Sequence, residues 1–348
     1  MSTGKSLLGA AVPAVLCAGT YAVIGGMCSK AFGERPDKDK ARYTYMFEHY
    51  AAYYPRREVS FPGTAGELHG FIYGEKNEKA LVVVCHGIGA FHEDYLSTII
   101  WFVDHGYRVF APDFTGSGYS EGKGTMGLPQ SAIDLDRVLS YIENDPELNR
   151  MPKLLFGHSW GAYAVGAVGN FQHDVKAAVT VAGFNDPIEQ LGSVFEGLLG
   201  KAGKAAYPFL RLWHRRRFGE NGLLRAVDGI NRSGIPTLIV QGAEDQLNAP
   251  DGTSIYAARS EITNPKVKYH VISKPYCADH LSPFFTDEAN ESVKDMVPIL
   301  TEINRKYKGD EQQKKTAEYY ASLDKELMSR PNEPFYTLVN EFYEEVLQ

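Results

Sequence analysis

The feature that most limits the possible folds of this chain is a regular alternation of apolar runs and amphipathic stretches. Six apolar runs have the length and residue types of buried strands: 80–85, 108–112, 153–156, 175–181, 236–241 and 267–272. Amphipathic stretches with helical spacing separate most of them: 93–105, 130–144, 162–170, 252–262 and 288–307. Because continuous apolar strands that alternate with helices build parallel sheets covered on both faces, the pattern predicts a doubly wound α/β fold.

Other segments extend or interrupt this alternation. Two short runs, 58–61 and 68–73, flank a Pro-Gly turn and predict an opening hairpin. About fifty residues with helical spacing and no strand pattern follow the sixth strand, where ligands bind in open α/β sheets. We therefore predict a helical lid there. The predicted parts are an apolar N-terminal segment (1–32), the first part of the core (33–184), the lid (185–234), the second part of the core (235–307) and a C-terminal extension (308–348). The extension is predicted to contain two helices broken near Pro331.

The N-terminal segment contains 23 uncharged residues, 7–29, between Lys5 and Lys30. A membrane-spanning helix needs about 20 apolar residues, so the favoured interpretation is a membrane anchor. A cleaved signal peptide and a helix packed on the body are the alternatives. More cations follow the stretch than precede it, which predicts a cytoplasmic body if the segment is an anchor. A cleaved signal would instead predict a secreted protein.

Composition excludes several other classes. The formal net charge of −7, with no long basic run, argues against a nucleic-acid partner. The four cysteines form no close cluster with histidine at metal-ligand spacing, so we predict no metal. No glycine-rich phosphate or dinucleotide loop follows a predicted strand, and no cofactor is expected.

The strongest functional signal is the segment Gly157-His158-Ser159-Trp160-Gly161, which lies between an apolar run and a helical stretch. A G-x-S-x-G segment in this setting holds a serine on a sharp turn with its hydroxyl exposed. The glycines are needed because side chains on either flank would collide with neighbouring backbone. The pattern predicts Ser159 as a nucleophile, with the His158 side chain turned away.

A serine nucleophile needs a base, and the base needs a carboxylate to orient it. Among ten histidines, His280 alone follows the last predicted strand on a loop that returns to the top of the sheet. Asp245 directly follows the run 236–241 and is the predicted acid. Asp186 is the alternative, and Asp279 is too close in sequence to His280 to orient it. The chain order serine, aspartate, histidine is the one expected after such a serine turn.

An oxyanion hole requires two backbone N–H groups aimed at the substrate oxygen. One is predicted from Trp160, the residue after the nucleophile. The other is predicted from the loop after the run 80–85, where Ile88 is the first candidate and Gly89 the second. His86 opens this loop and is interpreted as a structural residue.

These segments resemble the α/β-hydrolase superfamily over about 57–307, through His86-Gly87, the serine turn and the acid and base loops. The segment 113–120, Asp-Phe-Thr-Gly-Ser-Gly-Tyr-Ser, is similar to the D-x-x-G-x-G-x-S turn of the monoacylglycerol lipase, lysophospholipase and serine aminopeptidase branch. The resemblance implies an α/β-hydrolase fold and hydrolysis of acyl esters, less often amides, without a cofactor.

Together the residues and the resemblance predict a serine hydrolase acting on small-molecule acyl esters. An acyltransferase or a serine peptidase would use the same three residues, and a non-catalytic membrane-associated binding protein is the alternative from another class. The predicted lid carries a basic and aromatic cluster at 210–217. It could contact lipid headgroups, although a solvated helical face is the simpler interpretation.

Overall fold

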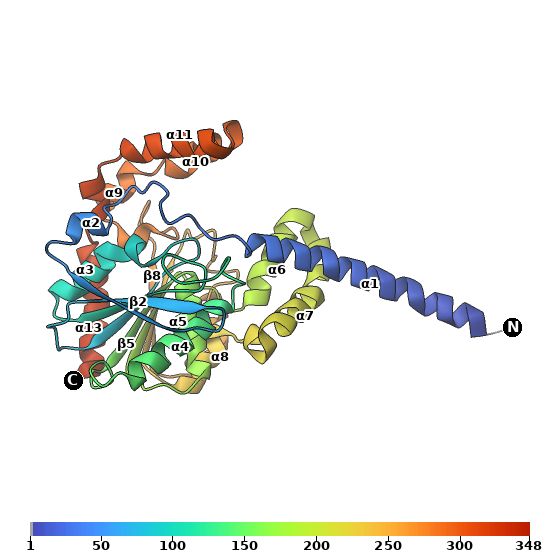
Figure 1. Ribbon diagram of the computed structural model, residues 1–348, viewed down its shortest axis with the longest axis horizontal. Helices are drawn as coiled ribbons and strands as arrows, with labels where there is room; N and C mark the ends of the chain where they lie inside the picture. The colour runs from blue at the N-terminus through green and yellow to red at the C-terminus, as the bar shows by residue number, and fades with distance from the viewer. Residues whose placement is uncertain (1–2) are drawn as a thin grey trace.

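An eight-stranded sheet forms the centre of the computed structural model, which describes residues 3–348 and side chains from residue 17 onward. Its order is β1-β2-β4-β3-β5-β6-β7-β8 (Figure 1). β1 and β2 form the predicted antiparallel hairpin, β2 pairs antiparallel with β4, and all remaining neighbours are parallel. The strands are β1 (Arg56–Pro62), β2 (Glu67–Tyr73), β3 (Leu81–Cys85), β4 (Arg108–Asp113), β5 (Lys153–His158), β6 (Ala177–Val181), β7 (Thr237–Gly242) and β8 (Val267–Ile272). The predicted α/β fold is confirmed.

Helices cover both faces of the sheet because alternate strand residues point to opposite sides. In β5, Leu155 packs with α4 (Gln130–Asn144), α5 (Trp160–Ala167) and α8 (Ala226–Ser233). Its neighbours Leu154 and Phe156 pack with α3 (Leu96–Asp104) and α13 (Glu333–Leu347) on the other face. Both faces are apolar, which explains why the strands read as continuous apolar runs in the sequence.

The C-terminal extension contains three helices where two were predicted: α11 (Gly309–Ala321), α12 (Lys325–Ser329) and α13. Its last helix belongs to the core, because Tyr336 and Tyr343 are fully buried against the sheet. The Tyr343 hydroxyl donates to the Leu155 carbonyl at 2.7 Å, and the Tyr336 hydroxyl lies 2.6 Å from Thr98 Oγ1. The extension as a whole is polar in composition, so the sequence did not indicate that one face of α13 is apolar and buried.

The predicted helix over 252–262 is wrong: only the 3-10 turn η5 (Ala257–Glu261) forms there. Residues before it form turns, with one isolated β-bridge between Ser254 and Phe184, and bond to the loop after β6. Ile255 N–H donates to the Gly183 carbonyl at 2.8 Å, and the Thr253 carbonyl accepts from Asn185 N–H at 2.8 Å. These groups are therefore not free for a helical turn. The predicted helix over 288–307 is divided into α9 (Asp287–Ser292) and α10 (Met296–Lys306).

The insertion after the sixth strand is helical, as predicted, and lies beside α1 (Thr3–Ala31) (Figure 1). It contains α6 (Pro187–Leu199), η3 (Gly200–Ala206), α7 (Tyr207–Phe218), η4 (Gly219–Leu223) and α8. The C-terminal part of α1 packs on α7, where Ile24, Cys28 and Phe32 join the core beside Trp213. The first part of α1 projects away from the body. The smaller elements are α2 (Phe47–Tyr50), η1 (His92–Tyr95), η2 (Val168–Asn170) and η6 (Ser282–Phe284).

The membrane-spanning anchor predicted over 7–29 is not supported. No helix in the described part of the chain combines the length and the hydrophobicity that crossing a bilayer requires. Glycine, proline and threonine residues within the stretch lower its hydropathy. One of these glycines has a packing role, since a Cβ on Gly25 would lie 3.2 Å from the Trp213 ring of α7.

Candidate active site

Ser159 lies at the sharp turn between β5 and α5, with backbone angles φ 55° and ψ −113°. A non-glycine residue with positive φ is strained, and the turn is held by close backbone packing. A Cβ on Gly157 would lie 2.4 Å from the Gly161 carbonyl oxygen, and one on Gly161 would lie 2.2 Å from the Cys85 carbonyl oxygen. The two glycines thus let β5, α5 and β3 approach closely enough to hold the serine in place.

His280 and Asp245 meet above the ends of β7 and β8. His280 Nδ1 lies 2.9 Å from Asp245 Oδ2. The Asp245 carboxylate is buried, and its other oxygen accepts from the backbone N–H groups of Leu247 and Asn248, each at 2.9 Å. Nδ1 therefore carries a proton that it donates to the carboxylate, which leaves His280 Nε2 free as a base.

The two other candidate carboxylates have different partners. Asp186 is the N-cap of α6, where its side chain accepts from Ile188 N–H at 2.7 Å and from Glu189 N–H at 3.4 Å. Asp279 accepts from the backbone N–H groups of Leu281 and Ser282 in its own loop. Of the three aspartates considered from the sequence, Asp245 is the one whose side chain contacts His280.

The proposed oxyanion donors flank the serine. Ile88 and Gly89 line the same cavity as Ser159 and His280, while Trp160 begins α5 directly after the serine. Within the described residues, neither the Ile88 nor the Trp160 backbone N–H donates to an acceptor in the chain. Two free donors beside a serine hydroxyl are what a developing oxyanion needs. The Trp160 ring is buried elsewhere, and its Nε1 donates to the Leu128 carbonyl at 2.7 Å.

His158 was predicted to point away from the site, and this prediction is wrong. Its ring lines the cavity and links two of the loops that surround the serine. Gly87 N–H donates to the Tyr95 hydroxyl at 2.9 Å, that hydroxyl lies 2.6 Å from His158 Nδ1, and His158 Nε2 lies 3.0 Å from the His280 carbonyl oxygen. Since Gly87 can only donate, Tyr95 donates to Nδ1, and Nε2–H donates to the carbonyl.

The charge state of His158 agrees with this chain of hydrogen bonds. Burial, with the neighbouring His280 as a second cause, holds the pKa of His158 well below its usual value. A neutral ring has one acceptor nitrogen and one donor nitrogen, as the chain requires. His158 therefore connects the loop that carries Ile88 to the loop that carries His280. Its position as the residue before the serine was the only sequence signal for this role.

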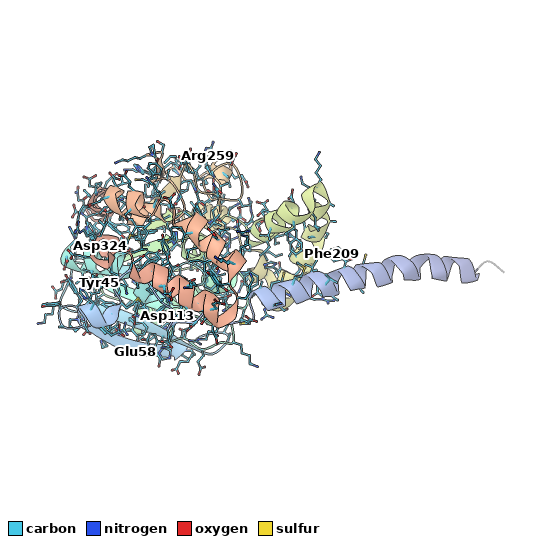
Figure 2. The ribbon with its side chains drawn as sticks, turned by 90° about the horizontal axis from the view of Figure 1, so that it is seen from above. Tyr45, Glu58, Asp113, Phe209, Arg259 and Asp324 are labelled. Atoms are coloured by element: carbon cyan, nitrogen blue, oxygen red, sulfur yellow. The ribbon has the colours of Figure 1, made fainter. Side chains whose placement is uncertain are left out.

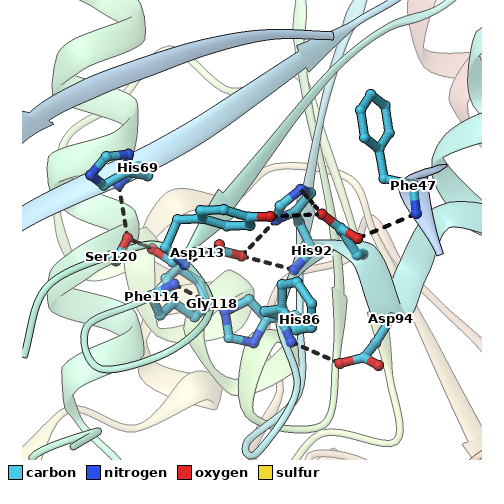
Figure 3. A network of polar contacts seen from close by, with 12 residues as sticks. Phe47, His69, His86, His92, Asp94, Asp113, Phe114, Gly118 and Ser120 are labelled. Carbon is cyan, nitrogen blue, oxygen red and sulfur yellow. Dashed lines mark hydrogen bonds and ion pairs between the residues drawn. The ribbon is translucent and has the colours of Figure 1, made fainter. Parts of the chain in front are cut away.

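The segment 113–120 belongs to a polar network with His86 and His92, which lie before and after Ile88 in the chain (Figure 3). Asp113 is buried, and its Oδ1 accepts from His92 N–H at 2.8 Å and lies 2.9 Å from His92 Nδ1. Phe114 N–H donates to His86 Nε2 at 3.0 Å, so the opposite nitrogen donates to the Gly87 carbonyl at 2.8 Å. Burial lowers the pKa of His86, consistent with a neutral ring. His86 thus fixes the loop that precedes Ile88.

A cavity of about 370 Å³ contains Ser159 and His280. Its outer wall comes from an N-terminal strap, residues 40–44, together with Phe285 and with Tyr320 of α11. The strap is fastened by an ion pair between Arg42 and Asp94, and by Lys40 Nζ donating to the Gly89 carbonyl at 3.3 Å. The Tyr43 ring contacts Phe285 and Tyr320 at centroid distances of 6.1 and 5.2 Å.

The predicted lid does not line this cavity. None of the residues 185–234 contributes to its wall, because the inserted helices pack on α1 and α5 instead. The strap and the C-terminal extension, which the sequence did not associate with the site, provide the cover. Within the described residues, no group of three or more histidine, cysteine, aspartate or glutamate side chains could hold a metal ion.

Comparisons with known proteins agree with this arrangement. Residues 76–220 match the model of a family described as serine aminopeptidase, S33. An esterase from Pyrococcus furiosus has a similar fold, with a TM-score of 0.52 and 19% identity over 76% of this chain and 95% of that one. An α/β hydrolase from Penicillium has a TM-score of 0.50 and 17% identity over 70% and 96%. No curated protein sequence matches. The sheet order and these structural neighbours show that the chain has the α/β-hydrolase fold, and residues 76–220 are similar to the serine aminopeptidase family.

Proposed function

We propose that this protein is a serine hydrolase that cleaves carboxylic esters of small molecules through an acyl-enzyme. The observation that carries the proposal is the pairing of His280 with Asp245 at 2.9 Å in the loops around a cavity that also contains Ser159. A strained serine, a histidine with one free nitrogen and a buried carboxylate are the three parts that nucleophilic acyl transfer to serine requires.

In the proposed reaction, Ser159 Oγ attacks the ester carbonyl while His280 Nε2 takes the hydroxyl proton. Asp245 stabilises the imidazolium that forms, and its own proton count does not change. The negative charge on the carbonyl oxygen is held by the backbone N–H groups of Ile88 and Trp160. His280 then protonates the leaving alcohol, and water activated by the same nitrogen releases the acid.

The charges in the cavity favour an ester over a peptide with a free amino terminus. An aminopeptidase needs an unpaired carboxylate to hold the substrate ammonium group. Among the described residues that line the cavity, Asp94 is the one carboxylate, and it is paired with Arg42. Lys40 lies in the same wall and would repel an ammonium group. The esterase from Pyrococcus furiosus, which is similar in fold, supports the same choice.

The test compares the wild type with Ser159→Ala, and uses Ser193→Ala on the exposed face of α6 as a matched control. A fluorophosphonate probe should label the wild type and the control and should leave Ser159→Ala unlabelled. The wild type and Ser193→Ala should hydrolyse p-nitrophenyl acetate and butyrate. For both proteins an alanine p-nitroanilide should be a poor substrate. Labelling that survives in Ser159→Ala would refute the nucleophile, and preference for the anilide would refute the ester proposal.

A further inference from the structure

An apolar groove of about 600 Å³ lies between α1 and the inserted helices, and the candidate active site does not use it. Its lining residues are mostly aliphatic and come from both sides: Val23, Ile24 and Met27 of α1, and Phe195, Leu198 and Leu199 of α6. No described residue lines both this groove and the cavity that contains Ser159. Figure 2 shows the inserted helices, at the level of Phe209, between the body and the projecting part of α1.

The groove is exposed to a degree that is unusual for aliphatic side chains. The exposed fractions are 64% for Val23, 68% for Leu198 and 63% for Leu199. A single exposed leucine requires no explanation, but several that share one groove form a contiguous apolar surface. Such surfaces, when rimmed by polar residues, mark contact sites for a protein or a membrane.

The inserted segment 193–220, which provides one wall of the groove and is here called its rim, is cationic although the chain as a whole is acidic. Residues 193–220 contain six lysine and arginine residues and two glutamates, against a net charge of −7 for the chain. The cations on the surface are Lys201, Lys204, Arg211, Arg215, Arg216 and Arg217. Arg215 pairs with Glu220 at 2.6 Å. In the part of the chain that the structure describes, Lys201, Lys204 and Arg216 have no carboxylate partner.

Arg216 brings one of these cations against α1. Its guanidinium group lies 5.1 Å from the ring centroid of Tyr21 on α1, so the cation stands beside the helix that forms one wall of the groove. The uncharged sequence 7–29 continues from this wall along α1, which projects from the body (Figure 1). An apolar surface bordered by lysine and arginine is the composition of segments that lie in a membrane interface.

We propose that the groove and its cationic rim dock this protein on the surface of an anionic lipid bilayer. The aliphatic side chains of α1 and α6 enter the boundary between headgroups and acyl chains, while Lys204 and Arg216 contact the phosphates. This binding is peripheral and requires no helix to cross the membrane. The charge of the rim decides between lipid and a second copy, because a symmetric dimer across the groove would place the cations of one rim close to those of the other.

The experiment uses the full chain with vesicles of phosphatidylcholine alone and of phosphatidylcholine with phosphatidylglycerol in equal parts. Binding is measured by flotation at low and at high salt. We expect binding to the mixed vesicles that weakens at least about tenfold at high salt or with the neutral vesicles, since each cation near an anionic surface adds to the affinity. Lys204→Glu with Arg216→Glu should weaken binding by a similar factor, and Leu198→Ser with Leu199→Ser should also reduce it.

Arg259→Glu provides a matched control, because its guanidinium also lies over a tyrosine ring, at 4.4 Å from Tyr256, but outside the groove. It should keep vesicle binding within about twofold of the wild type. Circular dichroism melts establish that each variant is folded. The proposal is overturned if the wild type ignores anionic vesicles or binds neutral ones equally. It is also overturned if analytical ultracentrifugation shows a dimer that Leu198→Ser with Leu199→Ser abolishes, because a second copy would then cover the groove.

Discussion

Removing one oxygen atom from Tyr95 should disturb both loops that approach the candidate nucleophile. The Tyr95 hydroxyl accepts from Gly87 N–H at 2.9 Å and lies 2.6 Å from His158 Nδ1. The substitution Tyr95→Phe keeps the ring and its packing but leaves both of these buried groups without a partner. A buried polar group left unpaired costs about 1–3 kcal/mol, so we expect a loss of about 2–4 kcal/mol in the free energy of unfolding.

The same change should lower activity, because Gly87 precedes the proposed oxyanion donor Ile88 and His158 holds the carbonyl of His280 at 3.0 Å. If half of the lost free energy appears in the transition state, kcat/KM for an activated ester falls about tenfold, since about 1.4 kcal/mol corresponds to a factor of ten. The melting temperature and kcat/KM, measured per folded molecule, test the two effects separately.

Tyr107→Phe is the matched control for this prediction. Tyr107 is buried, and its hydroxyl donates to Asn340 Oδ1 at 2.7 Å, far along the sheet from the serine. Asn340 Oδ1 keeps a second donor, Lys79 Nζ at 3.2 Å. The control should therefore lose stability, by about 1 kcal/mol, and retain kcat/KM. The reasoning is refuted if Tyr95→Phe retains wild-type kcat/KM, or if the two variants lose activity equally.

Two further predictions concern a carboxylate and a buried histidine. Asp245→Asn should lower kcat by about a thousandfold or more, because the amide favours the wrong tautomer of His280. Asp279→Asn should retain most activity. If steady-state kinetics ranked the two variants in the opposite order, the catalytic acid would be Asp279 instead. Burial lowers the pKa of His214 to about 4, so the folded state disfavours its protonation. The contribution of neutral His214 to the free energy of unfolding should therefore be fully present above pH 6.5 and fall as the pH drops towards 4, by roughly 2 kcal/mol at pH 5. Urea unfolding of the wild type and of His214→Gln at pH 7 and pH 5 tests this. If the variant loses as much stability as the wild type, the prediction is contradicted.

The sequence predicted the sheet and the position of the serine because both depend on local order along the chain. Strand-length apolar runs, the glycines of the serine turn, and acid and base loops at strand ends can all be read without knowing the tertiary contacts. The contact between His280 and Asp245 then follows from the parallel pairing of β7 with β8, which brings both loops to one edge.

The parts that the sequence did not predict depend on which surfaces meet. An amphipathic insertion above the strands suggested a lid, but its apolar faces pack on α1 and α5. The strap 40–44 covers the cavity through Tyr43 and Arg42, which look like ordinary polar-segment residues in isolation. His158 was missed because the direction of its ring is set by Tyr95, sixty-three residues earlier in the chain.

The burial of α13 has a consequence for biosynthesis. The face of β5 that carries Leu154 and Phe156 is covered by residues 333–347, and β5 itself is residues 153–158. Because α3 is synthesised before β5, a nascent chain leaves exposed only the part of this face that α13 covers, until residues 333–347 have emerged from the ribosome. Exposed apolar strands are the surfaces that chaperones bind and that aggregate when unprotected. The strand that presents the serine can therefore reach its final packing only after translation has passed α13, and chains interrupted before it are expected to be cleared rather than to act.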